Sequence, residues 1–223
     1  MGDATAGNAT VRHAVDAVPG TEVPVDGRRA RRERGRTAVI DAMLDLLQEG
    51  RIPPPVELVA ERSGVSVSTI FRYFQGLDTL QVQTFERFLE RFGPLITPCR
   101  APDASRSSRI AGFAAARLDL YEQAGTIMAV GRLRSLEHEP LVGATSRMRG
   151  LLAEQARSWF AVEMRAAPGA ASADLAPAVD AFTSLEAWDV MRRTHSRSRS
   201  QIDSTWQRGL AALCATWNEG ENR

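Results

Sequence analysis

A tight turn between two short helical segments constrains the fold of this chain more than any other feature of its sequence. Residues 63–66 form the turn, in which Gly64 can adopt a positive φ at little cost and Ser66 is a good N-cap. The segments 56–62 and 67–74 flank it. Two short helices joined by a Gly-containing turn are the signature of a helix-turn-helix, whose second helix enters the DNA major groove.

The rest of the sequence predicts helices and no strands. In residues 36–48 the apolar residues follow the i, i+3, i+4 and i+7 spacing of one helical face: Ile40, Met43, Leu44 and Leu47. Gly, Pro and Ser residues separate the later segments, and we expect helices over 78–92, 105–123, 126–138, 141–165, 174–193 and 199–218. The predicted fold class is all-α, with an N-terminal three-helix unit followed by a larger helical domain.

Composition and motifs argue against a membrane protein, a disulfide scaffold or an enzyme. No run of eighteen apolar residues is present, and Cys99 and Cys214 lie too far apart for a metal-type pair. The Glu-His-Glu triplet at 137–139 cannot share one ion, because consecutive helical residues point about 100° apart. No hydrolase, metalloprotease or phosphate-loop motif occurs. We expect a cytoplasmic protein without membrane contact, metal, cofactor or catalytic residue.

Arginines are concentrated ahead of the helix-turn-helix, although the formal net charge of the whole chain is only +1. Residues 28–36 contain six arginines and one glutamate. An arginine-rich arm before a three-helix DNA-binding unit can enter the minor groove or follow the backbone. The alternative is a solvated arm without a partner. Residues 1–27, rich in small residues and without a clear period, are predicted to form a flexible tail.

A longer run around the turn resembles a known family. Residues 59–74 read Val-Ala-Glu-Arg-Ser-Gly-Val-Ser-Val-Ser-Thr-Ile-Phe-Arg-Tyr-Phe, and residues 77–80 read Leu-Asp-Thr-Leu. This run resembles the DNA-binding domain of TetR family regulators. The resemblance implies about nine helices: three that bind DNA, a fourth that links them to a ligand-binding domain, and a last pair that forms a homodimer. It also implies a repressor that binds a near-palindromic operator and leaves it when a small molecule binds.

Four positions depart from the family pattern. Phe71 and Leu77 lie where a Tyr hydroxyl and a Lys often contact phosphate, and neither can donate a hydrogen bond. Pro55 replaces a frequent Thr cap, and Glu57 would repel phosphate. These departures motivate an alternative function, a helical small-molecule-binding protein whose DNA binding is weak or lost.

The candidate DNA contacts come from the arm and from the segment after the turn. Hydroxyl groups at the start of the second helix can donate to or accept from bases, Val67 can touch a thymine methyl, and Arg72 and Tyr73 can reach phosphate. The complete set is Arg31, Arg32, Arg34, Arg36, Ser66, Val67, Ser68, Thr69, Arg72 and Tyr73.

The C-terminal part, 81–223, is expected to bind the effector and to dimerise, while 28–80 binds DNA. By family analogy the effector-binding candidates are Phe113, Leu118, Tyr121, Met128, Trp159, Phe160 and Met164. Apolar stripes on the last two predicted helices give the dimer candidates Val179, Phe182, Leu185, Ile202, Trp206, Leu210 and Leu213. For every residue of both sets the alternative is packing within the core of one chain.

Overall fold

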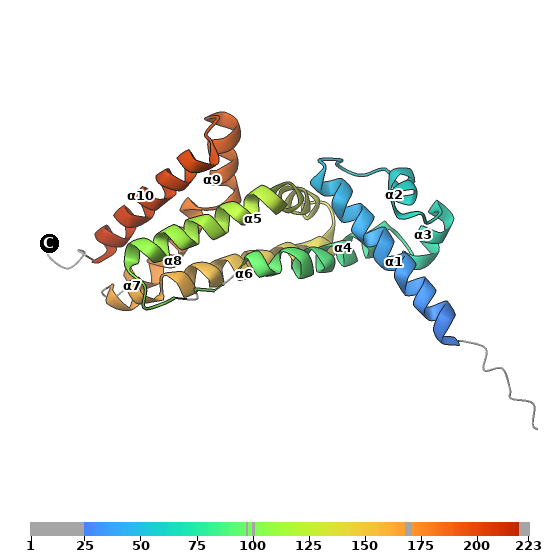
Figure 1. Ribbon diagram of the computed structural model, residues 1–223, viewed down its shortest axis with the longest axis horizontal. Helices are drawn as coiled ribbons and strands as arrows, with labels where there is room; N and C mark the ends of the chain where they lie inside the picture. Colours follow the sequence, from blue (N-terminus) through green and yellow to red (C-terminus); the bar gives the residue numbers. More distant parts are fainter. Residues whose placement is uncertain (1–24, 97, 100, 168–170, 219–223) are drawn as a thin grey trace, which may run out of the picture.

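The computed structural model describes residues 25–96, 98–99, 101–167 and 171–218. These residues form helices and connecting turns, and none of them lies in a strand, so the all-α fold class is confirmed. Figure 1 shows α1 to α3 gathered at one end of the molecule, with α4 leading from them to the longer helices. The elements are α1 (Val25–Gln48), α2 (Val56–Ser63), α3 (Val67–Phe74), α4 (Leu77–Phe92), α5 (Arg106–Arg134), α6 (Glu139–Trp159), α7 (Ala161–Ala166), α8 (Ala171–Phe182), α9 (Leu185–Asp189) and α10 (Arg199–Asn218), with a 3-10 turn η1 (Gly93–Leu95) and a π-helical turn η2 (Val190–Thr194).

The prediction of an arginine-rich arm that is separate from the first helix is wrong. The first helix begins at Val25 rather than near Arg36, so the whole arginine-rich stretch 28–36 is helical and continuous with the helix that packs in the core. Residues 1–24 of the predicted tail lie outside the described residues. Apolar periodicity missed the extension because it is polar, whereas arginine itself has a high helix propensity.

Three other predicted boundaries are also wrong. The segments 105–123 and 126–138 form one helix, α5, because Gly125 provides space rather than a break: a Cβ there would lie 3.3 Å from Trp188. The predicted helix 141–165 ends at Trp159, where Phe160 leaves helical geometry. The predicted helix 174–193 is interrupted at Ser184, whose side chain accepts a hydrogen bond from the amide of Ala187 and so caps α9.

Separate apolar clusters hold the two ends of the molecule. The N-terminal cluster joins α1, α2, α3 and the start of α4: Val39, Ala42, Met43, Leu46, Val59, Ile70, Phe74 and Leu80. A second cluster joins the rest of α4 to α5, α6 and α10, with Phe88, Tyr121 and Trp206 at its centre. Because α4 contributes Leu80 to the first cluster and Phe88 to the second, it connects the helix-turn-helix to the larger helical part.

A buried polar cluster lies at the far end of α5. Arg109 donates a hydrogen bond to Glu163 on α7, and both side chains are almost fully buried. Cys214 on α10 is also buried, and this burial, together with the nearby Glu163 carboxylate, raises the pKa of its thiol from 9.0 to about 11. The neutral thiol is therefore the form that the fold favours.

We expect Cys214 to be unreactive in the native protein at pH 8, because the thiolate is the nucleophile and is suppressed there. Ellman's reagent should titrate one thiol, the half-buried Cys99, and a second only after denaturation. The folded pKa of Cys214 is raised, so its contribution to stability is complete below pH 9 and is lost as pH rises from 9 to about 11. Rapid reaction of two thiols without denaturant would contradict this prediction.

Candidate functional site

The second helix of the helix-turn-helix, α3, is fixed at its start by a side-chain cap. Ser66 accepts a hydrogen bond from the amide of Thr69, and its hydroxyl lies 3.0 Å from the Thr69 hydroxyl. Gly64 ends α2 with a φ of 68°, in the left-handed region that Gly tolerates best. Ile70 and Phe74 bury the opposite side of α3, which leaves one face outward.

The outward face of α3 has both polar and apolar groups. Ser68, Phe71 and Arg72 are exposed and are spaced i, i+3 and i+4, so they share one side of the helix. Phe71 is 45% exposed, which is unusual for a phenyl ring without a partner. Phe71 is absent from the candidates predicted from the sequence, although the helical spacing from Ser68 identifies it.

The structure separates the helix-turn-helix candidates into two groups. Ser66, Ser68 and Arg72 are exposed, and the Arg72 guanidinium donates to the Thr69 hydroxyl at 3.3 Å. Val67 and Thr69 are half-buried beside this face. The exposed residues are therefore the more accessible candidates for contact with a base edge.

Tyr73 is instead held against α1. A Cβ at Gly35 would lie 2.9 Å from the Tyr73 ring, so the absent side chain lets the two helices approach closely. The Arg32 guanidinium stacks over the same ring, 5.9 Å from its centroid. Arg36 donates to the Tyr73 carbonyl and, at 2.7 Å, to Gln83, and it stacks over the Phe74 ring. Arg36 therefore positions α3 from within the unit, whereas we had expected it to contact DNA.

The arginines nearest the start of α1 remain available. Arg28, Arg31 and Arg34 are exposed and have no interaction partner within the described residues. Their i, i+3, i+6 spacing places them on one side of the helix. In Figure 1 this part of α1 projects beyond α2 and α3, so it presents positive charge next to the helix-turn-helix.

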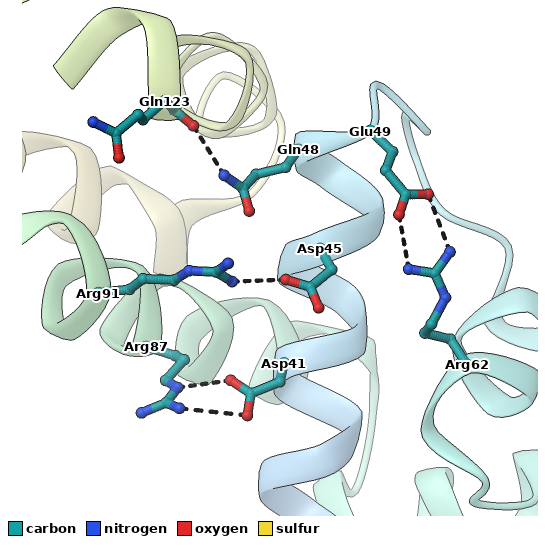
Figure 2. Close-up of polar contacts among 8 residues, drawn as sticks. All are labelled: Asp41, Asp45, Gln48, Glu49, Arg62, Arg87, Arg91 and Gln123. Atoms are coloured by element: carbon teal, nitrogen blue, oxygen red, sulfur yellow. Dashed lines mark hydrogen bonds and ion pairs between the residues drawn. The ribbon is translucent and has the colours of Figure 1, made fainter. Parts of the chain in front are cut away.

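Ion pairs connect α1 to its neighbours (Figure 2). Arg87 of α4 pairs with Asp41 at 2.7 Å, and Arg91 pairs with Asp45 at 2.6 Å. The hydrogen bond to Asp41 raises the pKa of Arg87. Each pair is partly exposed and contributes less than about 1 kcal/mol to stability, but together they fix the register of α4 along α1.

Two further contacts tie the end of α1. Gln48 donates to the carbonyl of Gln123 on α5 at 3.0 Å. Glu49 forms two hydrogen bonds with Arg62 of α2, and the nearer oxygen lies at 2.8 Å. This interaction lowers the pKa of the Glu49 carboxyl. These polar contacts add to the apolar packing that joins α1 to α4 and α5, in which Leu44 lies in one cluster with Phe88 and Tyr121.

A cavity of about 600 Å³ lies between α4, α5, α6 and α8. This volume falls within the range of small-molecule sites in proteins. Its apolar walls include Phe85, Phe88, Tyr121, Ile127, Met128, Met148 and Leu152. Because Phe85 and Phe88 belong to α4, one helix both lines the cavity and holds α1.

A buried ion pair lies against this cavity. Arg117 of α5 has no exposed surface and donates to Asp180 of α8 at 2.7 Å. It also donates to the Leu152 carbonyl at 2.7 Å and to the Tyr121 hydroxyl at 2.9 Å. Tyr121 donates in turn to the carbonyl of Thr183, and burial raises its pKa. The network joins three walls of the cavity.

Two of the seven effector candidates line the cavity, namely Tyr121 and Met128. The other five do not line it: Leu118 is buried in the cluster behind the cavity walls, and four residues lie in a separate apolar cluster, namely Phe113, Trp159, Phe160 and Met164. Sequence reasoning missed Arg117 and Asp180. An arginine between Ala116 and Leu118, in an otherwise apolar stretch, was the available signal, because a charge on a buried face needs a partner.

The dimer candidates also lie largely inside one chain. Val179, Ile202, Trp206 and Leu210 have no exposed surface, so in this structure they offer nothing to a second copy. Phe182, Leu185 and Leu213 are half-buried. A Cβ at Gly209 would lie 2.3 Å from the Phe182 ring, which shows that Phe182 packs directly on α10. The apolar stripes of α8 and α10 are thus explained by packing within the chain: Leu210 lies in one cluster with Val179, and Trp206 packs against Tyr121 of α5.

No group of three or more His, Cys, Asp or Glu residues that could hold a metal occurs among the described residues. His138, from the Glu-His-Glu triplet at 137–139, has a ring nitrogen 3.7 Å from the Asp78 carboxylate, and its other ring nitrogen contacts the Arg134 guanidinium. Within the same residues, no helix combines the length and apolarity that a membrane span requires.

Comparison with known proteins gives a structural match only. No family model and no curated protein matches the sequence. A crystal structure of a transcriptional regulator from Rhodococcus sp. Rha1 matches with a TM-score of 0.64 and 13% identity, over 84% of this chain and 97% of that one. The two chains share a fold.

Proposed function

We propose that this chain is a TetR-type transcriptional regulator, a repressor that binds a near-palindromic operator as a homodimer and is released by a small molecule. The exposed face of α3 carries the proposal: it is capped by Ser66, backed by Ile70 and Phe74, and presents Ser68 and Arg72 outward. Such a face fits the major groove. The shared fold with a transcriptional regulator supports the same conclusion.

A homodimer would present two α3 helices to successive major grooves. The outer side of α10 fits this role better than the buried stripe, because Ser204, Arg208, Ala211 and Ala215 are exposed and spaced along one face. The small side chains among them would let two copies of α10 approach closely.

Selection from genomic fragments, followed by mobility shifts at graded salt, tests the proposal. We expect one sequence-selective complex that contains two chains per site, with affinity that falls steeply as salt rises. Absence of any shift at low salt would reject DNA binding. It would favour the alternative, a helical small-molecule binder, which the exposed Phe71, Leu77 and Glu57 support because none of them can donate to phosphate.

Replacement of Arg28, Arg31 and Arg34 by Gln should weaken DNA binding evenly across sequences. Each phosphate that is no longer neutralised reduces the salt slope by about 0.9, so loss of one to three phosphate contacts per chain, or two to six per dimer, lowers the slope by roughly 2 to 5. A matched variant, Arg165, Arg193 and Arg197 to Gln, removes three exposed charges away from the helix-turn-helix and from the proposed α10 face, and should leave the slope unchanged. A change in the preferred operator would instead show that the arm reads bases.

Release of DNA is proposed to pass through α4. A ligand that fills the cavity presses on Phe85 and Phe88, while Arg87 and Arg91 carry the displacement to α1. The ligand then shifts the population toward dimers in which the two α3 helices are wrongly spaced for DNA.

A cavity-filling variant tests this coupling without a ligand. Ala153→Trp places an indole in the cavity and should lower DNA affinity about tenfold, within the usual range of coupling between sites. In the Asp41→Asn, Asp45→Asn background the same change should cost less than about threefold, because the ion pairs to α4 are absent. Ala129→Trp, at an exposed position on α5 outside the cavity lining, is the control. An equal loss in both backgrounds would reject transmission through these pairs.

A further inference from the structure

We propose that the effector is an apolar carboxylate, with its body inside the cavity and its anionic group at the rim beside Arg149 of α6. The proposal rests on the function proposed above, in which this cavity holds the effector. It adds the chemical class of that molecule. Three features carry it: the apolar walls, the excess of positive charge, and the distribution of partners among the arginines.

The apolar side chains that line the cavity indicate that most of the ligand is apolar. Phe88, Ile127, Met148 and Leu152 are buried residues that line the cavity. They come from α4, α5 and α6, so an apolar group between them contacts three helices. Burying an apolar body against such side chains removes apolar surface from water, which favours binding.

The charges around the cavity do not balance. Four arginines line it (Arg117, Arg132, Arg149 and Arg157), against two carboxylates (Asp180 and Glu186). Arg117 pairs with Asp180, and Arg132 pairs with Glu186. Arg157 pairs with Glu154, which lies on the same helix outside the cavity lining. Arg149 has no hydrogen bond or ion pair within the part of the chain that the structure describes.

The arginines that already pair with a carboxylate indicate where the anionic group of the ligand lies. Arg117 lies on the buried side, where Asp180 already neutralises it at 2.7 Å. A second carboxylate there would face Asp180 at close range and away from bulk water, where repulsion is strongest. Arg149 is exposed and uncompensated, so an anion beside it meets a free cation and keeps part of its hydration. Arg157, two turns along α6, also lines the cavity, but it is already paired with Glu154 and is therefore the weaker site for the anion.

Three probes with one alkyl chain and different head groups test the class: decanoate, 1-decanol and decyltrimethylammonium. Calorimetry with the full chain should give decanoate a Kd at least about fivefold below that of decanol, as expected for one partly exposed ion pair. The cation should bind at least about fivefold more weakly than decanol. Equal affinities, a preference for the cation, or binding of none of the three would overturn the proposal.

Substitutions of the arginines at the cavity rim test whether they cause the preference for decanoate over decanol. In Arg149→Gln the affinity for decanoate should fall to within about twofold of that for decanol, while decanol binding stays as in the parent chain. Arg165→Gln, an exposed arginine on α7 outside the cavity lining, should keep the full preference. Unchanged discrimination in both Arg149→Gln and the double variant with Arg157→Gln would reject the assignment.

The same samples separate this proposal from the proposed function. If decanoate binds with the expected preference and the protein shifts no DNA, the ligand class stands and the regulator fails. If the protein binds an operator and the three probes do not differ, the regulator stands and the ligand class fails. Thermal unfolding of each variant confirms that the chain remains folded.

Discussion

Ser68→Glu is expected to weaken operator binding by at least about a hundredfold without destabilising the protein. Ser68 lies on the exposed face of α3, one residue into the helix, and its side chain points to the side that we assign to DNA. A carboxylate there removes a hydroxyl that can bond to a base and places negative charge among phosphates. Leaving a buried hydrogen-bonding group of a base without its partner costs about 1–3 kcal/mol, and a dimer is affected at two sites.

The fold should tolerate this substitution for a separate reason. A negative side chain in the first turn of a helix is favoured by the helix dipole, by about 0.3–1 kcal/mol. The hydroxyl that caps α3 belongs to Ser66 and stays in place. Unfolding curves of the variant and the parent chain should therefore coincide or shift slightly toward greater stability.

A matched charge elsewhere separates recognition from net charge. Ser146→Glu adds the same carboxylate at an exposed position of α6, distant in sequence from α3 and outside the cavity lining. Fluorescence anisotropy with the selected operator should show less than about a threefold change for this variant. Equal losses for the two substitutions would mean that long-range charge repulsion explains the effect, and α3 would then not be the recognition helix.

The helix-turn-helix could be predicted because its signals are local. Gly64 ends α2 in the left-handed region, Ser66 caps α3, and the burial of Ile70 and Phe74 follows from their helical spacing. The role of Arg36 could not be predicted in this way. Its partners, the Tyr73 carbonyl and Gln83, lie far along the chain and approach it only in the folded unit.

The cavity could be predicted only in part. Aromatic residues at helical spacing look alike whether they line a cavity or fill a core, and the difference depends on how α4, α5, α6 and α8 meet. Phe113 and Phe160 pack edge to face in a cluster with α10, whereas Phe88 lines the cavity. Arg117 was the more informative residue, since a charged group in an apolar stretch of helix requires a buried partner.

Asp180→Ala is expected to lower the free energy of unfolding by about 3 kcal/mol, the largest single loss that we predict for the cavity walls. The substitution leaves Arg117 charged and fully buried, with its hydrogen bonds to Leu152 and Tyr121 but no counter-charge. Breaking a buried ion pair from one side usually costs about 3–5 kcal/mol. We take the lower end because the Asp180 side chain is 33% exposed, so water replaces part of the interaction with the carboxylate. Urea unfolding followed by circular dichroism measures the change.

The double variant Arg117→Met, Asp180→Leu decides why the loss occurs. If the cost comes from an uncompensated charge, removal of both charges should recover stability to within about 1 kcal/mol of the parent chain, because apolar pairs of similar volume often replace buried ion pairs without loss. If the double variant is as unstable as Asp180→Ala, the carboxylate stabilises the fold through its shape or another contact. The double variant should also bind an alkyl chain in the cavity as the parent chain does. It should still bind decanoate more tightly than decanol, because Arg149 and Arg157 are unchanged.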